Sequence, residues 1–269
     1  MKQHITNEVS NMSESERTYY GTDDPQERKI QMYGERRPRK GVAEKYLETT
    51  TITAEEAMVA LDSVKHNLII GTTGSGKTYF VAKLTQKFNT FIFVNTQEEE
   101  DVEAICQAVT STPADILDLF GRGYTKIEFV PSENAEEAVE QLEEIRQILF
   151  NLGASLYPKR RPDDPSMNYI IDEGQLYAPK MARTDLDNIG TRGRRWGVRG
   201  IFLTQRPQLF SSTLINMCEL QLIFRTGQYE AKYFNGYKIP VEAHKEWLDK
   251  EFHSILWDGR VMKRVLPAP

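Results

Sequence analysis

Short apolar runs alternate with segments of helical periodicity from about residue 46 to the end of the chain. Several runs are continuously apolar, as in Phe91-Ile92-Phe93-Val94, which is typical of strands that helices cover on both faces. Strands that alternate with helices form βαβ units, so the pattern predicts an α/β fold with a mainly parallel sheet. The predicted strands span residues 67–70, 90–94, 126–130, 169–171, 201–204 and 220–224.

Two further elements follow from the same pattern. The segment 134–150 has apolar residues three or four positions apart, which predicts a helix with one buried face. The segment 252–265 predicts a C-terminal β-hairpin that turns at Asp258-Gly259, because this dipeptide favours the positive φ angles of a tight turn. The apolar face of the predicted helix consists of Ala138, Leu142, Ile145 and Leu149.

Residues 1–45 have a different composition. They are rich in Ser, Glu, Asn, Arg and Lys and have almost no periodic apolar residues, so they cannot form a core by themselves. We therefore expect a flexible polar arm over 1–45 and a single folded domain over 46–269. The basic stretch 35–40 is compatible with contact to a polyanion, but a solvated tail is the simpler interpretation.

The composition narrows the class of protein. The 269 residues suffice for one large α/β domain without stabilising disulfides or metals, and Cys106 and Cys218 have no His or second Cys at metal-ligand spacing. No apolar run approaches the roughly 20 residues of a membrane-spanning helix, and the N-terminus lacks the apolar segment of a signal peptide. These features predict a soluble, intracellular protein. The net charge of −5 leaves nucleic acid open as a partner, because basic groups can gather on one surface.

A glycine-rich loop lies between the strand predicted to end at Ile70 and an apolar helix. Residues 71–78 match the pattern G-x-x-x-x-G-K-[ST] of a phosphate-binding loop, or Walker A motif. Its glycines let backbone N–H groups and the positive end of the helix point at phosphate oxygens. Lys77 is expected to reach the β- and γ-phosphates of ATP, and the hydroxyl of Thr78 to bind Mg²⁺. The loop consists of Gly71, Thr72, Thr73, Gly74, Ser75, Gly76, Lys77 and Thr78.

A second motif ends in two acidic residues. The apolar run 168–171 leads directly into Asp172 and Glu173, as in a Walker B motif. Asp172 is then expected to bind Mg²⁺, and Glu173 to orient and deprotonate the attacking water. An Asp-Glu pair that merely opens a helix is the alternative, but the Walker A motif upstream favours the catalytic interpretation.

Gln205 follows the predicted strand 201–204. Ligands of open α/β sheets meet the carboxyl ends of strands, so Gln205 is placed to hydrogen-bond the γ-phosphate or the attacking water. An ordinary loop glutamine before Arg206-Pro207 is the equally weighted alternative.

A longer block gives a more specific indication. Residues 193–207 read GRRWGVRGIFLTQRP, which closely resembles the GRKFGVGLVLVSQRP-like stretch of the HerA/FtsK superfamily of DNA-pumping ATPases. Residues 214–225, LINMCELQLIFR, resemble that family's following "LSQCNTQIILR" segment. The resemblance covers roughly residues 60–265.

The resemblance implies an additional-strand, catalytic-glutamate ATPase core in a homo-oligomeric, hexameric ring around double-stranded DNA. It also implies an arginine finger, which acts in trans on the nucleotide of the neighbouring subunit. Arg194 occupies the matching position, and removal of such a residue costs on the order of 10³-fold or more in rate. Nearby alternatives are Arg192, Arg195, Arg199 and Arg225.

The chain lacks other parts of its relatives. HerA carries a β-barrel before its phosphate-binding loop, and FtsK carries membrane-spanning helices and a winged helix. The remaining core is most similar to viral and phage genome-packaging ATPases. This implies partners at a capsid or membrane vertex, and a location in the host cytoplasm or the virion.

A DNA pump needs loops that contact phosphates through Lys and Arg. The best candidate combines Lys159, Arg160 and Arg161 with flanking prolines, which exclude regular structure. The loop 121–126 is a second candidate. For both loops, an ordinary solvated turn is an equal alternative.

The expected function is an ATP-driven translocase of double-stranded DNA that packages a viral genome. One alternative is a related motor in cellular DNA processing, conjugation or phage extrusion. Another is a nucleotide-dependent scaffold or switch with little turnover, which the presence of Glu173 and Gln205 disfavours.

Overall fold

The computed structural model describes residues 49–157, 167–181, 184–227 and 230–269, which all belong to one unit, Glu48–Pro269. The expected arm over 1–45 and its boundary with the domain 46–269 lie outside the described residues and stay predictions. Within the described ranges, no helix has both the length and the apolar character needed to cross a membrane.

A ten-stranded sheet forms the centre of the domain, in the order β1-β10-β9-β8-β2-β7-β6-β3-β5-β4. The strands from β8 to β4 are all parallel, whereas β9 pairs antiparallel with both β8 and β10. The strands are β1 (Thr51–Ile52), β2 (His66–Ile70), β3 (Phe91–Val94), β4 (Ala108–Thr110), β5 (Lys126–Phe129), β6 (Met167–Ile171), β7 (Val198–Thr204), β8 (Cys218–Ile223), β9 (Ser254–Trp257) and β10 (Met262–Val265).

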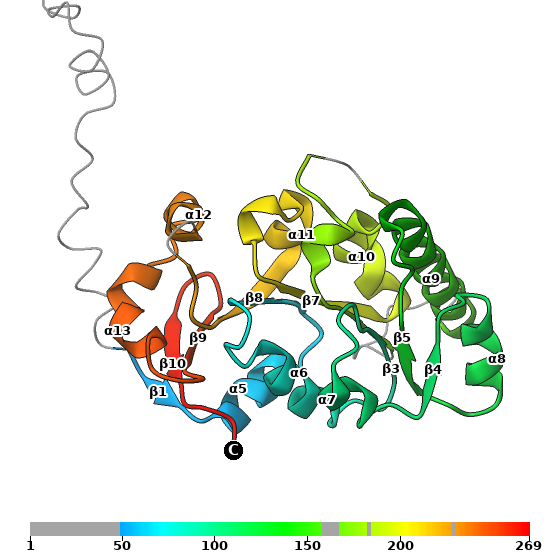
Figure 1. Ribbon diagram of the computed structural model, residues 1–269, viewed down its shortest axis with the longest axis horizontal. Coiled ribbons are helices and arrows are strands. Elements are labelled where there is room, and N and C mark those ends of the chain that lie inside the picture. The colour runs from blue at the N-terminus through cyan, green and yellow to red at the C-terminus, as the bar shows by residue number, and fades with distance from the viewer. Residues whose placement is uncertain (1–48, 158–166, 182–183, 228–229) are drawn as a thin grey trace, which may run out of the picture. The chain divides into compact units, whose positions relative to one another are not determined.

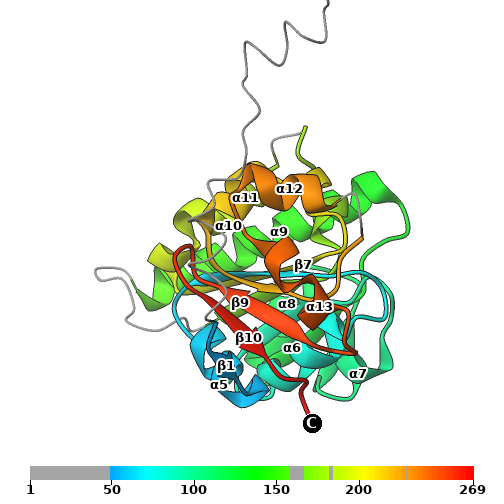
Figure 2. The ribbon, with the colours of Figure 1, turned by 90° about the vertical axis from the view of Figure 1, so that its left-hand side faces the viewer.

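Helices cover both faces of this sheet, with α5, α6 and α7 on one side and α9, α10 and α11 on the other (Figures 1 and 2). The α-helices are α5 (Ala54–Leu61), α6 (Lys77–Thr85), α7 (Glu100–Glu103), α8 (Asp115–Gly121), α9 (Ala135–Leu156), α10 (Asp187–Arg192), α11 (Ser212–Met217), α12 (Glu230–Gly236) and α13 (Lys245–Leu248). Short 3₁₀ helices are η1 (Gly174–Leu176), η2 (Gly193–Trp196), η3 (Pro207–Leu209) and η4 (Val241–His244).

The α/β fold expected from the sequence is therefore confirmed. All six predicted strands are present, with ends that differ by up to three residues. The helix predicted over 134–150 extends to Leu156, and Asn134 caps it by accepting hydrogen bonds from the backbone N–H groups of Glu136 and Glu137. The strands β1 and β4 were not predicted, because two or three residues at a sheet edge leave no apolar period to read.

The predicted C-terminal hairpin is also present. Asp258 Oδ1 accepts hydrogen bonds from the backbone N–H groups of Arg260 (2.9 Å) and Val261 (2.7 Å), and Gly259 has a φ of 87°. Because β9 pairs with β8, the hairpin continues the central sheet next to the strands that carry the phosphate-binding loop.

The strand order brings the candidate motifs together at the carboxyl ends of the parallel strands. β7 lies between β2 and β6, which is the additional strand implied by the resemblance. These three strands are parallel, so their carboxyl ends place the phosphate-binding loop, the acidic pair and Gln205 side by side.

Candidate active site

The phosphate-binding loop is held by both neighbouring strands. The Gly71 N–H donates to the Thr204 carbonyl at the end of β7 (3.2 Å), and the Thr72 N–H donates to the Arg225 carbonyl just after β8 (2.9 Å). Gly74 and Gly76 have φ angles of 70° and 93°, which side chains with a Cβ rarely adopt. The sheet therefore fixes the ends of the loop while the glycines give it the curvature to surround an anion.

Lys77 begins α6 and is buried. Its Nζ donates to the Thr72 carbonyl (3.2 Å), so the ammonium group is folded back over the loop. Among the described residues, the buried Ser75 hydroxyl is one of the polar atoms without a hydrogen-bond partner. A charged amine and an unpaired hydroxyl at the start of a helix suit a phosphate group.

The loop opens into a cavity of about 210 Å³. Its walls bring together Lys77, Thr78, the acidic pair and Gln205. Of the other residues predicted to hold phosphate, Thr73, Gly74 and Gly76 line the cavity, whereas Gly71, Thr72 and Ser75 do not. The cavity is lined by Thr73, Gly74, Gly76, Lys77, Thr78, Tyr79, Gln97, Glu99, Asp101, Asp172, Glu173, Gln205 and Phe252.

The two carboxylates are buried where β6 ends. Burial, and next the charge of Glu173, raise the pKa of Asp172 to about 7, although Lys77 lowers it. Burial also lowers the pKa of Lys77, against the opposing effect of both carboxylates. Two acidic groups packed against one lysine leave excess negative charge, which a divalent cation would compensate.

This charge imbalance gives a test of the apo protein. The folded-state pKa of Asp172, about 7, lies above its ordinary value of 3.8, so the carboxyl group destabilises the fold increasingly as pH rises through this interval. We expect Asp172→Asn to increase the free energy of unfolding at pH 8 by on the order of 4 kcal/mol, and to have little effect at pH 4. Denaturant unfolding without nucleotide or Mg²⁺ measures both values, and equal effects at the two pH values would contradict the assignment.

Glu173 has an unusual backbone conformation, and two glutamines bond its carboxylate. Its φ of 48° is uncommon for a residue with a Cβ. Each of its carboxylate oxygens accepts a hydrogen bond, Oε1 from Gln205 Nε2 and Oε2 from Gln175 Nε2. Gln205 Oε1 also accepts a hydrogen bond from the Thr73 hydroxyl (2.7 Å). Gln205 thus connects the phosphate-binding loop directly to the acidic pair.

Sequence reasoning missed Gln175. Its Oε1 accepts a hydrogen bond from the Thr204 hydroxyl (2.5 Å), so its side chain bridges β7 and the Glu173 carboxylate. The available indication was its position two residues after Glu173, where a strand-to-helix turn brings the side chain back toward the sheet end. We infer that Gln175 positions Glu173.

A Leu substitution tests this role. Gln175→Leu removes one amide donor from the carboxylate and is expected to lower kcat about tenfold or more, with the KM for ATP little changed because Gln175 does not line the phosphate cavity. Gln208→Leu is the matched control, since Gln208 bonds Glu230 instead (3.4 Å). A rise in KM at constant kcat would show that Gln175 contributes to binding rather than to positioning.

Arg194 lies at the amino ends of the parallel strands, whereas the phosphate-binding loop lies at their carboxyl ends. It belongs to η2, which precedes β7, and the seven residues of β7 span roughly 20 Å. Its guanidinium forms an ion pair with Glu219 (2.8 Å) at the start of β8, and Lys65 pairs with the same carboxylate (3.4 Å). Arg194 is partly exposed and cannot reach the nucleotide of its own chain.

A close helix contact fixes the segment that carries Arg194. A Cβ at Gly153 in α9 would collide with the backbone carbonyl of Trp196, so the glycine allows η2 to pack directly on the helix. The ring of Trp196 also lies under the Arg195 guanidinium, 4.8 Å from its centre. The GRRWG block is therefore anchored by its tryptophan while its arginines remain at the surface.

Arg199, one of the alternatives for the arginine that acts in trans, is instead buried inside the fold. Its side chain is only 1% exposed and donates to Asn168 Oδ1 (2.7 Å) and to the Ser63 carbonyl. Its guanidinium also lies 4.4 Å from the centre of the Phe88 ring. An arginine buried in this way cannot reach a neighbouring subunit. Arg192, Arg195 and Arg225 are exposed and stay as alternatives to Arg194.

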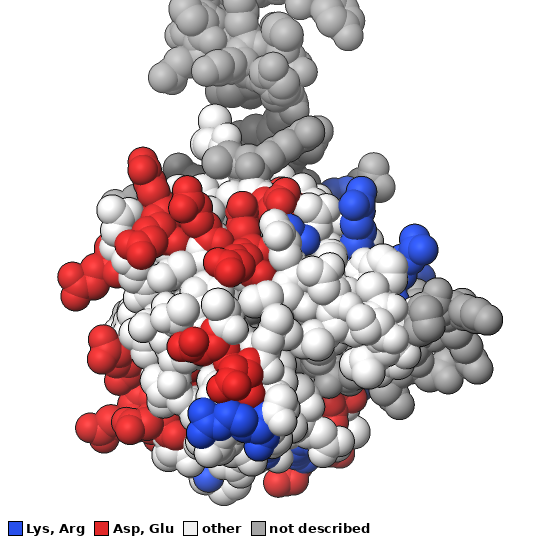
Figure 3. Space-filling view, turned by 90° about the vertical axis from the view of Figure 1, so that its right-hand side faces the viewer, with Lys and Arg blue, Asp and Glu red and all other residues white. Residues whose placement is uncertain are grey.

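The predicted DNA-contact residues are only partly covered by the structure. Lys159, Arg160 and Arg161 lie outside the described residues. In the second loop, Arg122 pairs with Asp118 (3.6 Å), as an ordinary solvated turn would. Figure 3 shows that Asp and Glu predominate on the face with α8 and α9.

Comparison with known proteins concerns the family and the fold of the chain. The sequence model of the family described as "Helicase HerA, central domain" matches residues 49–96. No curated protein shows a significant match to the sequence. The fold, however, is shared with several solved structures.

The genome packaging NTPase B204 of Sulfolobus turreted icosahedral virus 2, solved with AMPPCP, is 16% identical, covers 76% of this chain and 98% of its own, and has a TM-score of 0.57. B204 of Sulfolobus Turreted Icosahedral Virus, described as a DNA-packaging ATPase, is 19% identical over 77% of this chain and 100% of its own, with a TM-score of 0.57. VirB4 of Thermoanaerobacter pseudethanolicus is 9% identical over 76% of this chain and 89% of its own, with a TM-score of 0.52. The family model bears out the resemblance to HerA over residues 49–96, and the solved structures show that the fold is shared.

Proposed function

We propose that this P-loop ATPase of the HerA/FtsK type is one subunit of a ring that hydrolyses ATP to move double-stranded DNA, and that its task is the packaging of a viral genome. The observation that carries the proposal is the division of the site. Lys77, the acidic pair and Gln205 surround one cavity, whereas Arg194 is partly exposed at the opposite ends of the strands. A complete site then requires two chains.

The chain's own residues supply most of the hydrolytic chemistry. Lys77 and the N–H groups of the loop hold the β- and γ-phosphates, and Glu173 accepts a proton from the attacking water. Gln205 bonds both Thr73 and Glu173, so it is placed to change partners when the γ-phosphate is lost. The Thr78 hydroxyl and the Asp172 carboxylate line the same cavity and fit Mg²⁺, which prefers oxygen ligands. A bound Mg²⁺ would neutralise charge on the phosphates.

Arg194 completes the neighbouring site in this proposal. Its positive charge would stabilise the negative charge that develops on the γ-phosphate. To do so, its guanidinium must exchange the Glu219 carboxylate (2.8 Å) for phosphate oxygens. The ion pair with Glu219 therefore keeps the side chain in place in a free subunit.

The DNA part of the proposal rests on the similarity in fold to B204 and on surface charge. The acidic face of α8 and α9 (Figure 3) repels a polyanion, so it would face away from DNA. The basic run of Lys159, Arg160 and Arg161 would contact the DNA phosphates. Packaging further implies partners at a capsid or membrane vertex and a virion-associated location.

Phosphate release in the presence of duplex DNA tests this function. We expect duplex DNA to increase the ATPase rate severalfold at low salt, with the increase falling as salt is raised, because phosphate contacts release counterions. Lys77→Ala serves as the inactive control. A rate that is unchanged across DNA concentrations at low salt would contradict the translocase, and no turnover by the wild type under any condition would favour the scaffold or switch.

A further inference from the structure

An apolar cavity adjoins the phosphate cavity at the start of α6. It has a volume of about 400 Å³, and three of its residues, Gly76, Tyr79 and Phe252, also line the phosphate cavity. The two spaces therefore meet at these residues. The full lining is Gly76, Tyr79, Phe80, Phe224, Phe252 and Ala268.

We propose that this cavity receives the purine base of the nucleoside triphosphate by stacking, and that it distinguishes adenine from guanine only weakly. The proposal rests on the proposed function, since it assumes that the neighbouring loop binds the phosphates. A chain of phosphates that lies along Lys77 and Thr78 continues past Tyr79, the next residue of α6. The base at its end then enters the aromatic cavity.

Phe252 forms the boundary between the two cavities. Its ring packs over the phosphate-binding loop, since a Cβ at Gly76 would lie 3.0 Å from Phe252 Cδ1. The residue has a φ of 56°, and its side chain is 48% exposed. A left-handed conformation is costly for a bulky residue, and half-exposure leaves much of the ring without a packing role in the fold. Backbone strain of this kind is typical of ligand sites.

The other walls of the cavity are fixed before any ligand binds. The Tyr79 hydroxyl donates to the Pro269 carbonyl (2.6 Å), and Lys83 Nζ lies 5.4 Å from the centre of the same ring. Phe80 and Phe224 are buried and meet edge to face, with ring centres 5.9 Å apart. A rigid aromatic cavity loses little entropy when it binds a flat ring.

The side chains that line the cavity explain the weak selectivity. The Tyr79 hydroxyl is the one polar side-chain atom among the described lining residues, and its hydrogen bond goes to Pro269. Apolar pockets reject a ligand with an altered polar group only weakly, whereas a hydrogen-bonding site rejects it strongly. Stacking, in contrast, is available to every base because each has a π-face.

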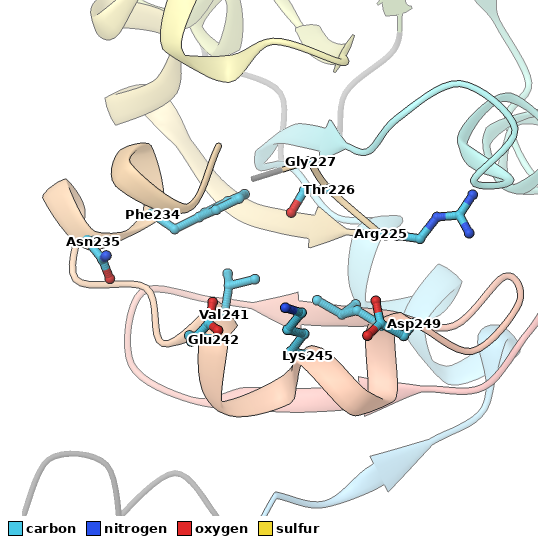
Figure 4. A pocket seen from close by; sticks show the side chains of 10 residues that line it. Arg225, Thr226, Gly227, Phe234, Asn235, Val241, Glu242, Lys245 and Asp249 are labelled. Atoms are coloured by element: carbon cyan, nitrogen blue, oxygen red, sulfur yellow. The ribbon is translucent and has the colours of Figure 1, made fainter. Parts of the chain in front are cut away.

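A second cavity, which no residue of the phosphate-binding loop lines, is the alternative location for the base. It has a volume of about 250 Å³ and lies beyond Arg225, and Figure 4 shows Phe234 directed toward Thr226 and Gly227 across it. Lys245 of α13 and Asp249, which follows this helix, also line it. Charged side chains and a single aromatic ring suit a planar apolar base less well than the aromatic cavity does.

Binding of ATP, GTP and inorganic tripolyphosphate to the full chain separates these possibilities. Because base stacking is worth about 1–3 kcal/mol, Phe252→Ala should raise the Kd of ATP and of GTP by a factor at least fivefold larger than it raises the Kd of tripolyphosphate, since Phe252 also borders the phosphate cavity. Phe234→Ala is the control for the second cavity and should alter none of the three. Phe252→Trp should retain the affinity, and its fluorescence should be quenched by ATP and GTP but not by tripolyphosphate.

Three outcomes would overturn the inference alone. An unchanged ATP affinity in Phe252→Ala would exclude the aromatic cavity as the base site, and a loss only in Phe234→Ala would assign the base to the second cavity. A wild-type preference for ATP over GTP of more than about a hundredfold would exclude recognition by stacking alone. Failure of the proposed function is distinguishable, because a protein that is not a translocase would keep these affinities and would show an ATPase rate that DNA does not change. A wild type that binds neither ATP nor tripolyphosphate would overturn both the inference and the proposed function.

Discussion

Replacement of Glu173 by Gln is expected to reduce phosphate release by about 10²–10⁴-fold while ATP remains bound. The carboxylate is the candidate proton acceptor next to Lys77 in the phosphate cavity. An amide keeps the size of the side chain but cannot take a proton from water. Single-turnover phosphate release measures the loss, and equilibrium binding of ATP measures the retained affinity.

Glu128→Gln is the matched control for this substitution. Glu128 is also a buried glutamate, and its carboxylate accepts a hydrogen bond from Asn95 Nδ2 (2.8 Å) on the neighbouring strand end. It does not line the phosphate cavity, so its substitution should leave the rate within a few-fold of wild type. Unchanged phosphate release in Glu173→Gln would remove Glu173 from the mechanism.

Arg194→Ala is expected to reduce the ATPase rate by about 10³-fold or more, although Arg194 lies far from the nucleotide of its own chain. The loss arises because the neighbouring site would lack the positive charge that stabilises its transition state. Binding of ATP by the isolated subunit should be unaffected, since the cavity around Lys77 contains no part of Arg194. Steady-state rates together with ATP affinities show both effects.

Mixing two inactive variants tests the shared site directly. A ring that contains Glu173→Gln and Arg194→Ala subunits has some interfaces with both residues intact, so activity should reappear on mixing. Activity should also reappear when Arg194→Ala is mixed with Lys77→Ala. Arg122→Ala is a surface control and should remain fully active by itself. If Arg195→Ala loses activity and Arg194→Ala does not, Arg195 is the arginine that acts on the neighbouring site. Two inactive variants that never complement each other would contradict a site shared between chains.

Local sequence was sufficient wherever a function depends on a contiguous segment. The phosphate-binding loop, the Asp172-Glu173 pair and the hairpin turn at Asp258-Gly259 could each be recognised from a few neighbouring residues. In such segments the backbone conformation and the chemistry depend on the same short run of residues. The parallel sheet was predictable for a related reason, because continuous apolar strands leave few alternatives to burial on both faces.

Contacts between distant segments could not be read in this way. Gln175 bonds Glu173 only because η1 turns it back toward Thr204 at the end of β7. Arg199 is the same residue type as the nearby exposed Arg192 and Arg195, and nothing in the local sequence distinguishes it from them. Its position in β7 nevertheless buries it against Phe88. The ion pair between Arg194 and Glu219 likewise depends on the order of the strands.

The sequence by itself determined that this chain has a phosphate-binding loop, an acidic pair and a HerA/FtsK-like block, because each consists of consecutive residues. Only the tertiary structure decided that Gln205 joins the loop to Glu173, that Arg194 faces away from both, and that Phe252 separates an aromatic cavity from the phosphates. The physical reason is that strand order sets which ends meet. Side chains more than a hundred residues apart in the sequence then lie together at the same ends of the strands, or apart at opposite ends.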